Sequence, residues 1–417
     1  DENNFVVECF FWHAIIHKDI IVYMQYEQPT SLPKPDQISA AHSARVARHI
    51  STKIRAAGGQ IGFAEFMYEA LYSPGLGYYS AGSIKFGRDG DFITAPEVST
   101  VFGRVLARQC AEVLVQIDNG EVLEFGAGSG KLAVDILSTL EAQDVLPAAY
   151  NIFEVSPDLI ERQKNRLQDE LPHLVERVRW LSTIPSNFEG VIIANEVLDA
   201  LPVERFVRRE AGVFQMLVSL SGDAFVWTET EASERLAAAV TNIEGEIAAP
   251  FPAGYRSEIC LAASAWIAEL SDCLRYGVVF LFDYGISQRE YYAPDRDDGW
   301  LRCHYRHYAH NDPLILPGIQ DLTAWVDFSS VASAAVAGGL DILGYQTQSQ
   351  FLMGGGLEIE MQGFSDLPVV KQLELSSQIK TLTLPGEMGE NFKCMALGRG
   401  DIASPTAFKF ADRTQAL

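Results

Sequence analysis

The chain has 417 residues, of which 48% are hydrophobic and 21% are charged, as is typical of a globular protein. Acidic residues outnumber lysine and arginine by 55 to 32, which gives a net charge of −23 at pH 7. This balance excludes the basic surface that nucleic acid requires, and instead favours a cationic partner such as a protein with an exposed arginine. No apolar run reaches the ~20 residues of a membrane-spanning helix. The six cysteines are scattered without a CxxC pair, so we expect reduced thiols, a cytoplasmic location and no metal site.

Residues 1–35 are predicted to be an extension that leads into the folded part. The apolar stretch at 6–16 follows acidic residues and precedes no small-residue cleavage site, unlike a secretory signal peptide. Met24 and the polar residues after it are typical of a natural start. We therefore interpret residues 1–23 as sequence that lies upstream of the native protein.

Residues 36–117 are predicted to form an N-terminal helical segment. Amphipathic patterns predict helices at 39–57, 63–72 and 98–117. The intervening residues 73–97 are rich in glycine, proline and aromatic side chains. A loop of this length in a compact protein is typical of a lid over a site.

The next part of the chain alternates between strands and helices. Strands are predicted at 121–125, 150–155, 177–181 and 191–194, with helices at 131–140 and 157–169. This alternation over 118–203 indicates a parallel sheet with helices on its faces. Residues 204–275 are predicted to be an insertion on the substrate side, with antiparallel strands followed by helices at 231–248 and 258–275.

Residues 276–417 are predicted to complete the sheet. The apolar run 278–285 is typical of a buried central strand, and a polar loop is expected at 286–328. A helix at 329–338 precedes two strands, 341–346 and 392–400, which we expect to form an antiparallel pair at the sheet edge. A second insertion, at about 351–388, lies between them. The predicted fold is thus a Rossmann-like α/β sheet.

The turn after the first strand of this sheet is the strongest functional signal. It reads Glu124-Phe125-Gly126-Ala127-Gly128-Ser129-Gly130. Glycines at a strand–helix turn let the backbone approach a ligand, and the helix N-terminus offers free amides. The spacing GxGxG differs from the dinucleotide pattern GxGxxG. Glu124 would repel a pyrophosphate but attract the sulfonium and ammonium groups of S-adenosylmethionine, so we expect this donor, bound by Glu124, Gly126, Ala127, Gly128 and Gly130.

Glu154 ends the second strand of the alternation. A carboxylate at this position can accept both hydroxyl groups of a ribose, as it does in nucleotide-binding Rossmann folds. It lies 28 residues after Gly126, later than the ~20 of the dinucleotide motif. We expect Glu154 to bind the donor, although a solvated carboxylate at a strand end is the alternative.

The segment Asn195–Pro202 follows the fourth strand and should face the methyl group that is transferred. Carboxylates here suit a guanidinium, which binds two carboxylate oxygens as a fork. We expect Asn195 to contact the donor and Glu196, Asp199 and Glu204 to be catalytic. The alternatives are that Asp199 caps a short helix and that Glu204 is solvated.

Two further signals are weaker. Asp283 ends the fifth strand and should lie in the same crevice. His304, His307 and His310 are spaced three apart in a polar loop, but no carboxylate or cysteine accompanies them as metal ligands would. Metal binding is therefore not expected, and His307 is our candidate for a proton-accepting histidine.

With these motifs in hand, the chain resembles the MidA-like family of class I methyltransferases. The resemblance rests on YSPGLGYY (72–79), GDFITAPE (90–97), EFGAGSGKLA (124–133), NEVLDALP (195–202), FDYG (282–285), PGIQDLTAWVDF (317–328) and MGENFK (388–393). It implies a seven-stranded methyltransferase sheet with S-adenosylmethionine as donor. For members related to the mitochondrial complex I assembly factor, it also implies methylation of a protein arginine.

Three functions remain open from the sequence. The first is a methyltransferase for a protein arginine, and the second is a methyltransferase for a small molecule that the 204–275 insertion would cover. The third is a non-catalytic assembly factor that binds the donor. The intact glycines and Glu154 argue against the third, because a scaffold needs no charged cradle for a cofactor.

Overall fold

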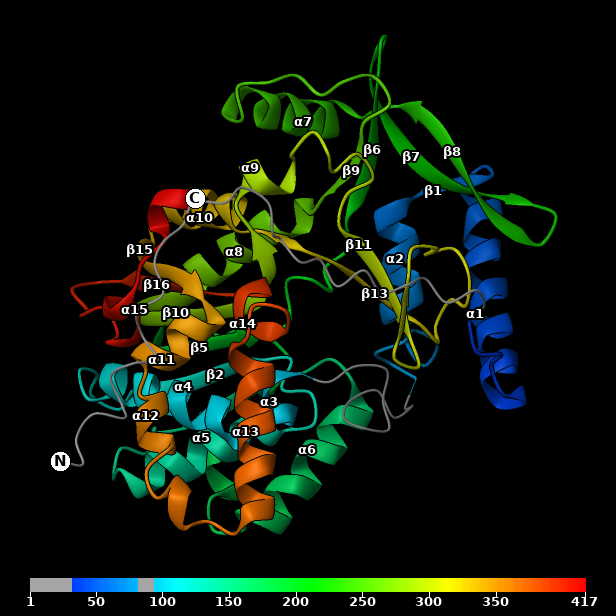
Figure 1. Cartoon of the computed structure of the whole chain (residues 1–417). Helices are drawn as coiled ribbons and strands as arrows, with labels where there is room; N and C mark the ends of the chain where they lie inside the picture. Colours follow the sequence, from blue (N-terminus) through cyan, green and yellow to red (C-terminus); the bar gives the residue numbers. More distant parts are fainter. Residues whose placement is uncertain (1–31, 82–93) are drawn as a thin grey trace.

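The computed structural model describes residues 32–81 and 94–417, and its centre is a mostly parallel twisted sheet (Figure 1). The strand order is β15-β16-β10-β5-β2-β3-β4, with the short β14 beside β10. Strand β16 runs antiparallel to both β10 and β15. This arrangement confirms the predicted Rossmann-like α/β sheet and its antiparallel edge. The strands are β2 (Glu121–Phe125), β3 (Tyr150–Phe153), β4 (Val178–Leu181), β5 (Phe188–Asn195), β10 (Leu274–Ile286), β14 (Val326–Asp327), β15 (Asp341–Thr347) and β16 (Phe392–Arg399).

The central strands are apolar on both faces because helices cover both sides of the sheet. In β10 the seven residues 277–283 are all buried. Gly190 and Gly277 lie opposite each other where β5 and β10 enter the sheet. A Cβ atom on Gly190 would lie 1.9 Å from the carbonyl oxygen of Glu121, so only glycine allows the strands to approach this closely.

Two layers of helices enclose the sheet. Apolar side chains of α4, α5 and α6 pack on one face, together with the C-terminal helices α11, α13 and α15. Those of α8 and α10 pack on the other face. The helices of the first face are α4 (Thr100–Leu114), α5 (Lys131–Ala142), α6 (Pro157–Glu170), α11 (Gln348–Gly354), α13 (Val369–Thr383) and α15 (Ala407–Phe410), accompanied by the short α3 (Ala95–Val98), α12 (Leu357–Glu360) and α14 (Met388–Asn391). Those of the second are α8 (Leu261–Cys273) and α10 (Phe328–Ala337).

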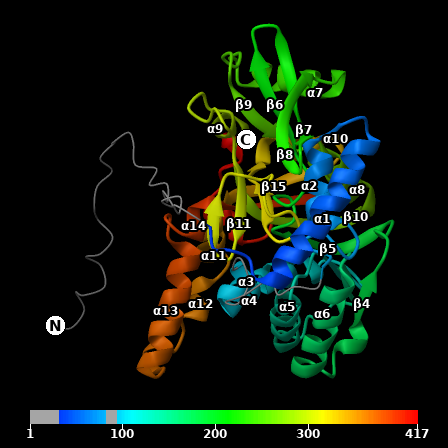
Figure 2. The same ribbon diagram turned by 90° about the vertical axis from the view of Figure 1, so that its right-hand side faces the viewer.

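A second sheet lies beyond the carboxyl ends of the central strands, toward the top of Figure 1. Its order is β1-β7-β6-β9, with β8 beside β7. Helices α1 and α2 pack on this sheet, and so does α7. Figure 2 shows α1 and α2 beside β7 and β8. The elements are β1 (Gln60–Gly62), β6 (Glu204–Arg209), β7 (Gly212–Ser221), β8 (Ala224–Glu231), β9 (Arg256–Ile259), α1 (Gln37–Ala56), α2 (Phe63–Tyr72) and α7 (Glu234–Glu246).

Two predicted regions contain more structure than the sequence suggested. The 204–275 segment combines strands of the second sheet with α8, which packs on the central sheet. The prediction of a polar loop at 286–328 is wrong, because the chain there forms the short α9 and a third sheet in the order β12-β11-β13. Its elements are α9 (Gln288–Tyr291), β11 (Leu301–Tyr305), β12 (Tyr308–His310) and β13 (Asp321–Ala324).

Some sequence predictions fall outside the described residues. These are the interpretation of residues 1–23 and the middle of the predicted lid, residues 82–93. The described ends of the predicted lid, 73–81 and 94–97, do contribute residues to the cavity described below. Within 32–81 and 94–417, no helix has the length and apolar character needed to cross a membrane.

Candidate active site

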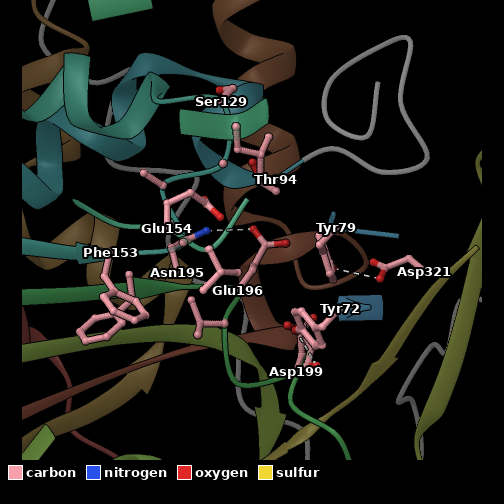
Figure 3. Close-up of a pocket in the computed structure, with 18 of the residues that line it drawn as sticks. Tyr72, Tyr79, Thr94, Ser129, Phe153, Glu154, Asn195, Glu196, Asp199 and Asp321 are labelled. Atoms are coloured by element: carbon pink, nitrogen blue, oxygen red, sulfur yellow. Dashed lines mark hydrogen bonds between the residues drawn. The ribbon is translucent and has the colours of Figure 1, made fainter. Parts of the chain in front are cut away.

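A cavity of ≈ 940 Å³ opens at the carboxyl ends of strands β2, β3 and β5 (Figure 3). Ligands of open α/β sheets bind at this edge. Among the described residues that line the cavity, seven are Asp or Glu and one is a lysine, Lys131, whose ammonium group is paired with Asp135 at 2.7 Å. The lining therefore favours ligands that carry positive charge.

The glycine turn after β2 forms one wall of the cavity. Gly126, Gly128 and Gly130 have φ of 63°, 52° and 80°, in the left-handed region that side chains disfavour. The N–H of Gly126 donates to the carbonyl of Phe153 at 3.0 Å, which ties the turn to β3. Gly126, Ala127 and Gly128 line the cavity, while Gly130 lies at the N-cap of α5. This backbone leaves room for a ligand and places it at the start of a helix.

Glu154 and Asn195 offer oxygen atoms to the same cavity. The carboxylate of Glu154 accepts the N–H of Ser156 at 2.9 Å and the amide of Gln163 at 3.2 Å, so its direction is fixed. The buried Oδ1 of Asn195 has no hydrogen-bond partner among the described residues. A buried acceptor without a donor is energetically costly, which indicates a ligand donor at this point. Both side chains therefore present oxygen atoms that a ligand with hydrogen-bond donors can use.

Glu124 lies deeper, below the glycine turn. Its side chain is buried and accepts a hydrogen bond from the Tyr150 hydroxyl at 2.7 Å. Burial raises the pKa of Glu124 to about 7. The carboxyl group therefore changes its charge near neutral pH, and a cation nearby would favour the ionised form.

Glu196 follows β5 and is directed into the centre of the cavity (Figure 3). Its backbone has φ of 54°, an uncommon conformation for a residue with a long side chain. The N–H of Glu196 donates to the carbonyl of Phe282 at 2.8 Å, and the Asn195 amide donates to its Oε1 at 3.1 Å. Burial, followed by repulsion from Asp199, raises the pKa of Glu196 well above its usual range. The backbone thus holds a carboxylate in a place that disfavours its charge until a cation binds.

Asp199 and Asp283 form a second carboxylate pair beside it. Asp283 is buried near the end of β10 and accepts the N–H groups of Leu198 at 2.9 Å and Asp199 at 3.2 Å. Burial, and then repulsion from Asp283, raises the pKa of Asp199. Asp199 lines the cavity, whereas Asp283 holds the backbone that carries it. The pair therefore divides into a ligand-facing group and a supporting group.

The opposite wall is aromatic and ends in another carboxylate. Tyr72 donates to the carbonyl of Ala200 at 2.9 Å, and Tyr79 donates to Oδ1 of Asp321 at 2.9 Å (Figure 3). Both tyrosines and Asp321 line the cavity. Tyr72 is the last residue of α2, Tyr79 lies in the segment after it, and Asp321 is on β13. The N-terminal helices and the third sheet therefore complete the site.

Comparison with known proteins shows the family of this chain. Residues 105–346 match the Methyltransf_28 family, described as S-adenosyl-L-methionine-dependent methyltransferases. A crystal structure of a Burkholderia thailandensis protein bound to S-adenosyl-homocysteine is 39% identical, with a TM-score of 0.87, and the match covers 93% of this chain and 100% of that one. The chain belongs to this methyltransferase family. S-adenosylmethionine is its methyl donor, as the glycine turn and its neighbouring acids predicted.

Curated relatives of this methyltransferase carry a more specific name. A Drosophila melanogaster protein named a mitochondrial protein arginine methyltransferase NDUFAF7 homolog is 29% identical, over 91% of this chain and 90% of that protein. The Mus musculus protein arginine methyltransferase NDUFAF7 is 30% identical, over 84% of this chain and 83% of that protein. Both names, like that of the Homo sapiens relative, include the word mitochondrial. These names contradict the expected cytoplasmic location, which is therefore wrong.

Two catalytic candidates from the sequence lie away from the cavity of the methyltransferase. Glu204 is the first residue of β6, and its carboxylate accepts the Gln215 amide at 2.9 Å within the second sheet. His307 is exposed in the turn between β11 and β12, where it and Arg306 have φ of 63° and 50°. We withdraw a catalytic role for both. The histidine of this loop that does line the cavity is His304, whose pKa burial lowers to about 4.

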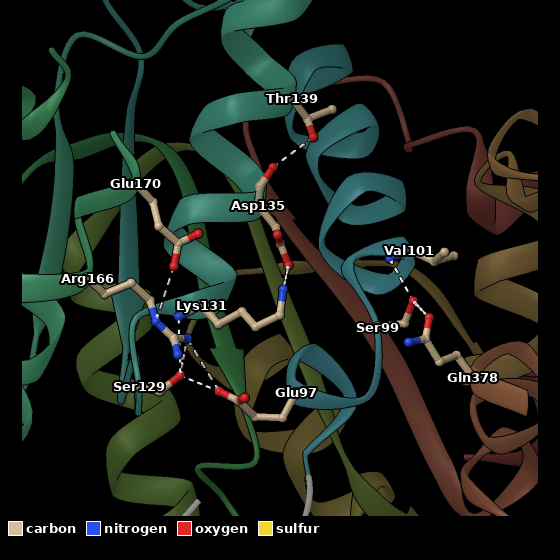
Figure 4. A network of polar contacts seen from close by, with 10 residues as sticks. All are labelled: Glu97, Ser99, Val101, Ser129, Lys131, Asp135, Thr139, Arg166, Glu170 and Gln378. Carbon is tan, nitrogen blue, oxygen red and sulfur yellow. Dashed lines mark hydrogen bonds and ion pairs between the residues drawn. The ribbon is translucent and has the colours of Figure 1, made fainter. Parts of the chain in front are cut away.

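Polar contacts also hold the glycine turn of the methyltransferase to neighbouring helices (Figure 4). Ser129 donates to Glu97 of α3, and Arg166 of α6 donates to Ser129 at 2.8 Å. Ser99, the N-cap of α4, donates to Gln378 of α13 at 2.9 Å. The glycine turn, α3 and α6 are therefore held together by polar contacts between side chains. Within the described part of the chain, no group of His, Cys, Asp and Glu could hold a metal ion.

Sequence reasoning missed Tyr72, Tyr79 and Asp321 as site residues. Each lies within a motif that carried the family resemblance, at 72–79 or at 317–328. A signal was therefore present, but nothing local to either motif indicates that the two meet. Their contact spans 242 positions of the chain.

Proposed function

We propose that this methyltransferase transfers the methyl group of S-adenosylmethionine to a guanidinium nitrogen of a protein arginine. The observation that carries the proposal is the group of carboxylates at the end of β5. Among the described residues no lysine or arginine forms an ion pair with Glu196, Asp199 or Asp283, and burial is the largest cause of the raised pKa of each. Buried carboxylates without a cation are unfavourable, so a cationic ligand is the natural complement of this site. The names of the curated relatives support the same acceptor.

The residues divide into a donor end and an acceptor end. We assign the backbone of Gly126, Ala127 and Gly128 to the donor, with Gly130 supporting the turn and Glu154 accepting the ribose hydroxyls. Glu124 and Asn195 would offer oxygen atoms to the positively charged end of the donor. The donor supplies a methyl group on a sulfonium, which is an electrophile that needs no further activation.

Glu196 and Asp199 act on the acceptor in this assignment. A carboxylate aligns the planar guanidinium so that one nitrogen points at the methyl carbon. The nitrogen–carbon bond forms as the carbon–sulfur bond breaks, and the electron pair of that bond stays on sulfur. The product guanidinium loses one proton, which Glu196 or Asp199 can accept because burial raises the pKa of both carboxyl groups.

The experiment uses the full chain, S-adenosylmethionine labelled in its methyl group, and peptides that each contain one arginine or one lysine at the same position. We expect label on the arginine peptides, located on the guanidinium by fragmentation in mass spectrometry. Glu196→Gln should lose most of this activity, and Glu204→Gln is its matched control, since Glu204 lies away from the cavity. Label on lysine peptides alone, or on small molecules of a lysate but on no peptide, would refute the arginine assignment.

A further inference from the structure

Three tyrosines form a row from the protein surface into the acidic end of the cavity. Tyr68 is 50% exposed, and its ring centroid lies 5.7 Å from that of Tyr72. The Tyr72 ring in turn lies 5.5 Å from that of Tyr79, with an interplanar angle of 25°. All three line the cavity. They therefore provide one continuous aromatic wall between the surface and the carboxylates.

The hydroxyl groups of the two inner tyrosines are already engaged, which fixes their rings. Tyr72 donates to the carbonyl of Ala200 and Tyr79 to Asp321, both at 2.9 Å. Burial raises the pKa of both tyrosines well above the usual range, so their hydroxyls stay neutral donors. What they present to the cavity is ring surface. Aromatic faces attract cations, above all when water is excluded.

Asp321 lies where this wall meets the carboxylates. It is 1% exposed, and its Oδ1 also accepts the N–H of Leu322 at 3.0 Å. Repulsion from Asp321 contributes to the raised pKa of Glu196 and of Asp199, so the three carboxylates interact electrostatically with one another. Figure 3 shows Glu196 and Asp321 on either side of Tyr79. The site thus holds carboxylates from two separate parts of the fold.

We propose that Tyr68, Tyr72 and Tyr79 line the path of the acceptor side chain, and that Asp321 is the second carboxylate that binds its guanidinium, opposite Glu196. This inference rests on the proposed arginine specificity and deepens it. A guanidinium is a planar fork that can bind carboxylates along two edges, whereas an ammonium is a compact point charge. Two carboxylates from different directions therefore select arginine over lysine. In this proposal Asp321, on β13, is the acceptor-binding carboxylate in place of Glu204, which the sequence had suggested.

The first experiment measures binding without turnover. N-acetyl-arginine amide is titrated into the wild-type protein saturated with S-adenosyl-homocysteine, and N-acetyl-lysine amide is titrated in parallel. We expect Asp321→Asn and Tyr68→Ala each to weaken binding of the arginine compound by ~10-fold or more, as expected for the loss of a charge-assisted hydrogen bond or a cation–π contact. The affinity for S-adenosyl-homocysteine should stay within about two-fold of the wild type, because neither residue belongs to the donor end.

Two matched variants guard against a general loss of structure. Tyr308→Ala removes another exposed tyrosine, 44% exposed on β12 and outside the cavity lining, and should leave arginine binding unchanged. Tyr79→Phe removes the hydroxyl that holds Asp321 but keeps both the ring and the carboxylate. It should therefore weaken binding less than Asp321→Asn does. Melting curves with S-adenosyl-homocysteine establish that each variant folds.

The second experiment repeats the comparison with turnover of single-arginine peptides. Asp321→Asn should raise KM for the peptide by ~10-fold or more and reduce the preference for arginine over lysine. Unchanged binding and KM in both Asp321→Asn and Tyr68→Ala would overturn the inference, and so would an equal loss of donor affinity. If the wild type binds the arginine compound but methylates no arginine peptide, the proposed function fails while the binding results still decide the role of Asp321.

Discussion

Replacing Glu196 by glutamine changes the charge of the site and little else. The backbone N–H of Glu196 keeps its bond to the Phe282 carbonyl at 2.8 Å, because the substitution does not touch the main chain. The new amide has the same size as the carboxylate and can still accept a hydrogen bond from Asn195, now 3.1 Å from Oε1. Any effect on activity therefore measures the negative charge.

The size of that effect follows from the contact that is lost. A hydrogen bond to a charged group contributes ~1.5–3 kcal/mol, and each 1.36 kcal/mol corresponds to a factor of ten, so kcat/KM should fall by roughly 10- to 150-fold. We expect a value near ~10²-fold, because the charge is lost at the reacting centre itself. Donor affinity should change by no more than a few-fold, since the glycine turn and Glu154 carry donor binding in our assignment.

The assay combines initial rates with labelled donor and calorimetry with S-adenosyl-homocysteine. Glu204→Gln is the control for a glutamate outside the cavity. If Glu196→Gln loses donor binding, Glu196 belongs to the donor end and the division of the site is wrong. If turnover is unchanged, the guanidinium assignment loses its main support.

The same variant tests the electrostatics without any substrate. The pKa of Glu196 is raised in the folded protein, so the carboxyl group stabilises the fold at pH below its unfolded pKa of ~4.3 and loses that contribution as pH rises through the folded value. Glutamine does not titrate. The variant should therefore melt like the wild type near pH 4 and at a higher temperature than the wild type near pH 8. A variant that melts at a lower temperature at both pH values would contradict this account.

Three further predictions address the donor end and the sheet. Gly128→Val should abolish binding of S-adenosyl-homocysteine in calorimetry, because valine disfavours φ of 52° and fills the cradle; unchanged affinity would make the turn purely structural. The affinity for S-adenosylmethionine should rise between about pH 6 and about pH 8 as Glu124, with a pKa of about 7, becomes ionised, and Glu124→Gln should remove this rise. Gly190→Ala should destabilise the protein by at least ~3 kcal/mol in urea unfolding, because its Cβ would lie 1.9 Å from the Glu121 carbonyl oxygen, whereas Gly245→Ala, in open space on α7, should not destabilise it.

The central sheet could be predicted because its signals are local. Apolar runs, the glycine turn and the alternation of strands and helices each lie within a few consecutive residues, and the carboxyl edge of a parallel sheet is a general location for ligands. Glu154 and Glu196 were found for this reason, since each directly follows a strand. The observed ends of these elements differ from the predicted ends by only a few residues. For example, the strand predicted at 191–194 is β5, Phe188–Asn195.

The acceptor side could not be predicted in the same way because it depends on register and on distant contacts. Glu204 follows Pro202 closely in sequence, but it begins a strand whose alternation points its carboxylate at Gln215. His307 lies in the tight turn between β11 and β12, which pairs Tyr305 with Tyr308. The register of strands in the second sheet cannot be inferred from one sequence, because it depends on which strands pair. The same holds for the turn between β11 and β12 in the third sheet.

The hydrogen bonds of the buried carboxylates distinguish a carboxylate that supports the backbone from one that faces the cavity. Asp283 accepts three backbone N–H groups, from Leu198, Asp199 and Tyr284, which offset part of the cost of its burial and fix the loop between β5 and β6. Glu196 instead lines the cavity from a strained backbone position, and burial raises its pKa although the Asn195 amide and the backbone N–H of Ala95 act to lower it. Asp283 therefore supports the loop, whereas Glu196 keeps its carboxylate at the cavity, where the proposed guanidinium would add N–H donors and a compensating charge.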